Sequence, residues 1–171
     1  MSISYDYWQG ESVHDVLPSL SAFRCQILAP NGTVTVSDDM THLQHYLDAD
    51  SIVIVANDAQ MIVGYISLVS DWSIYHKRLL NTDAIEWDAL VSQGPLVHEY
   101  YRGEGVAKGL ISEVIDATQH REAHALVLDP GPLYDNRHAA AVHYLANQFG
   151  FSLLTSDPLD PPLFKRSIEF D

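Results

Sequence analysis

The spacing of hydrophobic positions predicts two helices near the start of the chain. Over Val13–Leu28 apolar side chains recur three and four positions apart, the period of one helix face. Pro18 lies in this segment, so we expect it to sit in the first turn or to interrupt the helix. A second helix is predicted to begin at Ser37 or Asp38, residue types that cap helices well. Its apolar face would carry Met40, Leu43 and Leu47.

The middle of the chain is rich in β-branched residues, which favour strands. Ser51–Ala56 and Met61–Val69 flank the turn-forming stretch Asn57–Gln60, so they predict an antiparallel hairpin. A longer strand region follows over Ala84–His98. Within it, Gln93-Gly94-Pro95 marks the expected position of a β-bulge.

The second half of the chain alternates helices and strands. Helical spacing follows Gly105, and Ala125–Leu128 is a short apolar run typical of a buried strand. Asn136 is positioned to cap a helix that ends near Phe149. Phe151–Leu154 and Phe164–Phe170 are predicted to close the fold as strands. This order predicts a mixed α/β sheet with helices on both faces, in a single domain spanning residues 1–171.

The chain is strongly acidic, and this bears on which classes of binding partner we expect. Aspartate and glutamate number 23 against 9 lysine and arginine residues, a formal net charge of −14. Nucleic acid and anionic membranes both need a basic surface, so we expect neither as a partner. The charge favours a cationic, amine-bearing partner, although an acidic surface that only keeps the protein soluble is an equal alternative.

The cysteine and histidine positions predict a cytoplasmic protein without a metal site. Cys25 stands alone, so no internal disulfide is expected, and we find no signal peptide and no apolar run long enough to span a bilayer. The pairs His42/His45 and His120/His124 lack further ligands with tetrahedral spacing. We therefore expect these histidines to be surface residues.

A glycine-rich turn is the strongest functional signal in the chain. The segment 96–110 runs from an apolar strand end through Gly103 and Gly105 directly into a helix. Backbone amides at a helix start have no intrahelical partner and carry partial positive charge, so they bind anions, usually phosphate. Two alternatives stay open: a structural turn without a ligand, or a dinucleotide site built from Gly103, Gly105, Gly109 and Asp129.

Within this turn, Arg102-x-x-Gly105-x-Ala107 resembles the signature of the GNAT superfamily of N-acyltransferases. The preceding strand, with Tyr101-Arg102-Gly103, extends the likeness. Met61–Leu68 with its Gly-aromatic pair, Ala125–Leu128, and the Asn136 helix ending in Phe149-Gly150-Phe151 are similar to further elements of that family. The resemblance divides the chain into a variable front end, residues 1–50, and a CoA-binding core, residues 51–171.

The resemblance implies a central, mostly antiparallel mixed sheet and an enzyme that uses acetyl-CoA as acyl donor. It implies that the CoA pyrophosphate lies on successive backbone amides of the turn: Gly103, Glu104, Gly105, Val106, Ala107 and Lys108. The backbone of Leu96, Val97 and His98 would pair with pantetheine like an added strand. Arg102 would close the turn. Asn136 would face the pantetheine or the thioester, or it is only a helix cap.

Acyl transfer to an amine requires a base for the amine and an acid for the leaving thiolate. The helix that follows Asn136 offers Tyr144 as the acid, with His143 as second choice, and a tyrosine that merely packs in the core is the alternative. Candidate bases are Glu86 and Asp88, two positions apart on one strand face, and His98. Either carboxylate is alternatively a solvated strand residue. The Val97 N–H would stabilise the oxyanion.

The acceptor is expected between the front helices and residues 70–83. Five aromatic side chains are candidate walls of an amine pocket, or else core or the interface of a homodimer: Tyr5, Tyr7, Trp8, Trp72 and Tyr75. The sequence thus predicts an N-acetyltransferase acting on a primary amine. Its rivals are an inactive CoA-binding regulatory or interaction protein and a nicotinamide-binding oxidoreductase.

Overall fold

A computed structural model describes residues 2–45, 47, 50–69, 89–121, 123–131, 139–154 and 162–168 of the chain. In these residues seven strands form one sheet in the order β1-β2-β3-β4-β5-β7-β6. The strands are β1 (Ile3–Gln9), β2 (Ile52–Asp58), β3 (Met61–Val69), β4 (Ala89–Val97), β5 (Ala125–Asp129), β6 (Ser152–Leu153) and β7 (Phe164–Ser167). Neighbouring strands are antiparallel except β4 and β5, which run parallel. The expectation of a mixed, mostly antiparallel sheet is confirmed.

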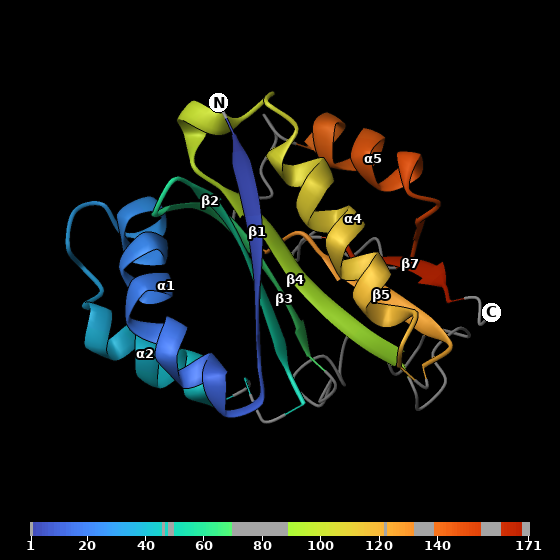
Figure 1. Cartoon of the computed structure of the whole chain (residues 1–171). Helices are drawn as coiled ribbons and strands as arrows, with labels where there is room; N and C mark the ends of the chain where they lie inside the picture. Colours follow the sequence, from blue (N-terminus) through green and yellow to red (C-terminus); the bar gives the residue numbers. More distant parts are fainter. Residues whose placement is uncertain are drawn as a thin grey trace.

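Helices cover both faces of this sheet (Figure 1). The α-helices are α1 (Val13–Leu28), α2 (Val36–Gln44), α4 (Val106–Thr118) and α5 (Ala139–Gln148), and short 3-10 turns are η1 (Gly10–Ser12) and η3 (Glu99–Tyr101). In one hydrophobic core, α1 and α2 pack against Val53, Val55 and Val127 of the sheet. In the other core, on the opposite face, α4 and α5 pack against Ile54, Leu126 and Leu128. Strand residues alternate between the two cores because successive side chains point to opposite faces.

Two close approaches fix α4 on the sheet. A Cβ at Gly64 of β3 would lie 3.1–3.2 Å from the Leu96 carbonyl oxygen and from side chains of Val106 and Leu110. Gly109 leaves the space on α4 that the Tyr5 hydroxyl of β1 occupies. Gly109 therefore allows β1 to pack closely on α4. This packing accounts for a glycine at the end of the pattern, so no bound dinucleotide is needed to explain it.

The structure corrects the expected element boundaries at several points. β1 was not predicted, although its alternating residues show the period of a strand. Thr35, not Ser37 or Asp38, caps α2, because its side chain accepts the Asp38 N–H. Helix α1 runs unbroken through Pro18, which lies beyond the first turn. Proline removes one intrahelical hydrogen bond, but packing of the buried apolar face of α1 stabilises the rest of the helix.

The hairpin and the closing strands also differ from expectation. β2 extends to Asp58, so its turn is shorter than Asn57–Gln60, and β6 and β7 are shorter than predicted. Residues 84–88 of the expected long strand lie outside the described residues. Across the described part of the chain, no helix has the length and apolar character needed to cross a membrane.

Candidate functional site

The site is built around an irregularity in β4. Across the β3–β4 ladder, Tyr65 pairs with Leu96 and Ser67 pairs with Gln93, so one extra residue is accommodated on β4 at Gly94-Pro95. The bulge expected at this position is confirmed. A bulge bends its strand and increases the local twist. The parallel ladder from β4 to β5 runs from Ala89/Ala125 to Gln93/Asp129 and ends at the same point. Beyond it the two strands separate.

The separation leaves strand backbone facing the gap. The His98 N–H donates to the Val63 carbonyl at 2.9 Å, on the β3 side. Because successive backbone N–H groups of a strand point in opposite directions, the Val97 N–H points to the side from which β5 has diverged. Pro95 has no N–H to offer there. Val97 therefore supplies a strand donor toward the gap.

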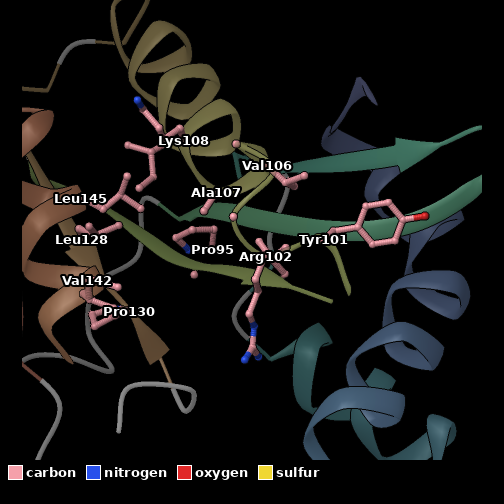
Figure 2. Close-up of a pocket in the computed structure, with 16 residues that line it drawn as sticks. Pro95, Tyr101, Arg102, Val106, Ala107, Lys108, Leu128, Pro130, Val142 and Leu145 are labelled. Carbon is pink, nitrogen blue, oxygen red and sulfur yellow. The ribbon is translucent and has the colours of Figure 1, made fainter. Parts of the chain in front are cut away.

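A cavity of 460 Å³ occupies this gap on the α4/α5 face (Figure 2). We call it the first cavity. Its walls come from the bulge of β4, the end of β5, the glycine turn with the start of α4, and one face of α5. Residues that line it include Gly94, Pro95, Val97, Val106, Ala107, Leu128, Pro130, Ala141, Val142 and Leu145. These are apolar, so the cavity suits an aliphatic ligand.

The glycine turn closes one end of this cavity with backbone amides. Gly103 and Gly105 adopt φ values of 81° and 82°, and a Cβ on either would meet no atom within 4 Å. A ligand can therefore approach the turn closely. The first intrahelical bond here runs from the Gly109 N–H to the Gly105 carbonyl at 3.0 Å. The N–H groups of residues 105–108 precede that bond and form an anion-binding arrangement.

Neighbouring side chains hold the turn in place. The Tyr101 hydroxyl donates to Asp58 Oδ2 at 2.6 Å, which ties the turn to the β2–β3 hairpin. This hydrogen bond, with a smaller effect of burial, raises the pKa of Tyr101. His98 Nδ1 accepts the Tyr100 N–H at 3.2 Å and caps η3. His98, predicted beside the cofactor, thus has a structural contact, and its ring stacks on Tyr100 with centroids 5.1 Å apart.

Two basic side chains flank the turn. Arg102 and Lys108 are exposed and line the first cavity. Figure 2 shows them pointing in opposite directions from the turn, with the Tyr101 hydroxyl directed away from the cavity. Glu104, between the glycines, is exposed. In a chain with a net charge of −14, Arg102 and Lys108 are cations beside the amides where an anion would bind.

The two catalytic residues predicted on α5 do not line the first cavity. Helix α5 presents Ala141, Val142 and Leu145 to the first cavity, and neither Tyr144 nor His143 is among the residues that line it. Tyr144 is 67% exposed. The His143 ring packs edge-on against Phe164 of β7, with centroids 5.1 Å apart. Glu86, Asp88 and Asn136 lie outside the described residues, as do Trp72 and Tyr75.

A second cavity, of 420 Å³, lies on the α1/α2 face of the sheet. Its lining includes Leu28 of α1, Tyr65 of β3, Leu96 of β4 and Asp129 of β5. The Leu96 side chain thus belongs to this cavity, while its backbone borders the bulge. His42 and His45, predicted as surface residues, are exposed and stand at its edge. The predicted aromatic walls Tyr5, Tyr7 and Trp8 line neither cavity.

A charged network that the sequence reasoning missed borders the second cavity. Arg24 of α1 forms an ion pair with Asp39 of α2 at 3.0 Å and donates from Nη1 to the Tyr65 hydroxyl. Burial raises the pKa of Tyr65, and the Arg24 charge partly offsets this. Asp39 could not be recognised as a functional or structural charge from the sequence, because only the packing of α1 on α2 shows that Arg24 is its partner.

The described residues contain no group of three or more histidine, cysteine, aspartate or glutamate side chains arranged to hold a metal ion.

Comparison with known proteins identifies the family. Residues 22–151 match the model of the Acetyltransferase (GNAT) family, which is most of the chain. The chain therefore belongs to the GNAT acetyltransferase family, as its glycine turn and strand order indicate. None of the curated proteins matches it.

Solved structures share the fold at low identity. A GNAT-family acetyltransferase from Streptococcus pneumoniae aligns with a TM-score of 0.67 and 16% identity, covering 98% of this chain and 100% of that one. The putative acetyltransferase yncA from Salmonella typhimurium, solved with acetyl-CoA, aligns at 0.65 and 15%, covering 99% and 95%. An aminoglycoside 6'-N-acetyltransferase complexed with coenzyme A aligns at 0.62 and 13%, covering 99% and 98%.

Proposed function

We propose that this protein is an N-acetyltransferase that moves the acetyl group of acetyl-CoA directly to a primary amine. The observation that carries the proposal is the gap between β4 and β5, which joins an apolar cavity to a turn of backbone amides. An aliphatic pantetheine arm and an anionic pyrophosphate need these two environments side by side. Solved relatives of the same fold contain acetyl-CoA or coenzyme A, which supports this donor.

The residues present fit the donor in three places. The amides from Gly103 to Lys108 would hold the pyrophosphate, and Arg102 and Lys108 would add positive charge beside it. The Val97 carbonyl would accept a pantetheine amide N–H in place of β5, which leaves the Val97 N–H for the reacting group. Apolar side chains from β5 and α5, among them Leu128 and Val142, would pack on the arm and exclude water.

Bound acetyl-CoA supplies an acetyl group activated as a thioester. The acceptor amine must first lose a proton, because an amine like that of lysine has a pKa near ~10. Its lone pair then forms the C–N bond and the C–S bond breaks, while the nitrogen releases a second proton and the thiolate takes one up. The Val97 N–H would donate to the oxygen that becomes negative during this exchange.

The proposal is tested by thermal unfolding with acetyl-CoA and, separately, with NADH. Ligand at about a hundred times its Kd stabilises a folded protein by about 2.7 kcal/mol. For a domain of this size that corresponds to a Tm rise of several degrees. We expect a rise with acetyl-CoA alone. A rise with NADH alone would favour the dinucleotide site, and no rise with acetyl-CoA at millimolar concentration would refute the donor assignment.

A CoA-binding protein without turnover is the second candidate. The apolar face that α5 turns to the first cavity favours it, since Ala141, Val142 and Leu145 offer no proton. Release of CoA from acetyl-CoA in the presence of primary amines separates the two. Acetyl-CoA binding without amine-dependent release would support the second candidate.

The acid assignment is a prediction with its own test. If Tyr144 protonates the leaving thiolate, Tyr144→Phe lowers kcat by about a hundredfold, within the range of general acid catalysis, and leaves the Kd for acetyl-CoA unchanged. His143→Ala is the companion variant for the second choice. An unchanged kcat in Tyr144→Phe would mean that this exposed side chain plays no part in the chemistry.

A further inference from the structure

The two cavities meet where the strands separate. Gly94 of the bulge and Pro130, directly after β5, line both of them. One cavity lies on the α4/α5 face and the other on the α1/α2 face, so the two cavities border the same gap between β4 and β5 from opposite sides of the sheet. A molecule in the second cavity would therefore touch Gly94 of the bulge, three residues before Val97, beside which the proposed function puts the thioester.

We propose that the second cavity receives a small primary amine and that the Asp129 carboxylate holds the nitrogen of that amine at the junction. This inference rests on the proposed function, because it takes the first cavity as the donor site.

The position of Asp129 follows from strand alternation. Leu128 lines the first cavity, and Asp129, the next residue of β5, lines the second. Pro130, which follows at once, borders both. Asp129 therefore stands on the acceptor side, one residue from the junction. Its Oδ1 accepts the Gly131 N–H at 2.9 Å, which fixes the carboxylate at the strand end.

Charge supports the same assignment. Among the described residues that line the second cavity, Asp129 is the one acid. Arg24, which also lines it, is paired with Asp39 at 3.0 Å, so its charge is offset locally. A carboxylate has two oxygens and about four acceptor positions, so Asp129 can accept an ammonium hydrogen in addition to the Gly131 N–H. After the amine has lost one proton to solvent, it still carries N–H donors for the carboxylate.

The volume and walls define the class of acceptor. A space of 420 Å³ is in the range of small-molecule sites. Leu28, Leu96 and the Tyr65 ring offer apolar surface for the body of the acceptor, while Gln93, held by Ser67 at 3.2 Å, adds a polar group near the junction. This arrangement favours a compact monoamine with an apolar body over a lysine side chain carried by a peptide.

Substitution of Asp129 by asparagine gives a clean test. Asparagine can also accept the Gly131 N–H through its side-chain oxygen, so the turn is kept and the charge is lost. The probe is 2-phenylethylamine, titrated by calorimetry into protein saturated with CoA. We expect Asp129→Asn to raise the Kd for the amine about tenfold or more, the effect of losing a hydrogen bond to a charged group. Asp116→Asn, an exposed carboxylate on α4 that lines neither cavity, should leave this Kd unchanged.

Turnover provides the second measurement. With acetyl-CoA and 2-phenylethylamine, Asp129→Asn should raise KM for the amine at least tenfold and leave KM for acetyl-CoA unchanged. A ten-residue peptide containing lysine should react with kcat/KM at least tenfold below the small amine. Equal amine binding by wild type and Asp129→Asn, or a peptide preferred over the amine, would overturn the inference. If acetyl-CoA raises the Tm and the amine does not bind, the inference fails while the donor assignment stands; if acetyl-CoA produces no shift, the proposed function itself has failed.

Discussion

Single residues set the shape of the glycine turn. Gly105 holds a φ of 82° at the start of α4, where an L side chain is strained, and no atom lies within 4 Å of its absent Cβ. The empty space is not needed by the folded chain itself. A ligand would approach the amides through this open space. Gly64 differs, because a Cβ there would contact neighbouring atoms of the protein itself.

We predict different effects for two glycines with similar backbones. Gly150, after α5, has a φ of 78° and equally open space, but it does not line the first cavity. Gly105→Ala and Gly150→Ala should each destabilise the protein by about 1 kcal/mol, the strain of a left-handed alanine. Only Gly105→Ala should weaken acetyl-CoA binding, because its methyl group would stand before the amides.

Calorimetric titration of acetyl-CoA into both variants checks this prediction, with urea unfolding as the measure of stability. Equal acetyl-CoA affinity in the two variants would show that the turn does not contact the ligand.

At the scale of elements, α1 and α2 are joined to the sheet through buried charge. The Arg24 and Asp39 side chains are 13% and 9% exposed, and the guanidinium also reaches Tyr65 of β3. Removing one partner of a buried ion pair leaves the other charge uncompensated. The network therefore holds two helices and a strand at the wall of the second cavity.

Asp39→Asn should destabilise the protein by about 3 kcal/mol, as expected when a buried pair loses one charge. Asp38→Asn is the matched control, because Asp38 is the adjacent residue on α2 and is exposed. It should change the free energy of unfolding by less than about 0.5 kcal/mol. Urea unfolding of both variants makes the comparison, and similar losses in the two would rule out a structural ion pair.

At the scale of the whole molecule, four tyrosines connect distant parts of the chain. Tyr7 of β1 donates to Glu113 of α4, Tyr65 contacts Arg24, and Tyr101 donates to Asp58. Tyr5 of β1 packs against α4. The pKa of each is raised: burial is the largest cause for Tyr5, Tyr7 and Tyr65, and the hydrogen bond to Asp58 is the largest for Tyr101.

These shifts predict loss of stability at alkaline pH. Above about pH 10 the unfolded chain releases tyrosine protons that the folded chain retains, so the unfolded state binds fewer protons and gains stability. The contribution is complete below pH ~10 and is lost as the pH rises through the higher folded values. Urea unfolding from pH 8 to pH 11 should show this fall, and Tyr65→Phe should reduce its slope. A constant free energy of unfolding over that range would contradict the prediction.

The glycine turn and most element positions followed from local sequence. Helical spacing, β-branched runs and paired glycines act over a few neighbouring residues, so α1, α4, β3, β5 and the bulge at Gly94-Pro95 were predicted. The family resemblance also rests on such local order, and it is confirmed. Strand β1 carries the period of a strand too, but Ile3 is its one aliphatic residue among polar and aromatic ones, which gave a weak pattern.

Tertiary structure decided what each residue contacts. Gly109 matched a nucleotide pattern, yet the Tyr5 hydroxyl fills its space. Asp129 matched the acid of a dinucleotide site, yet it lines a cavity on the opposite face from the glycine turn. Arg24 and Asp39 are 15 positions apart and became partners only when α1 packed on α2. Local sequence fixes spacing and conformation, but the contacts of a side chain depend on elements that only folding brings together.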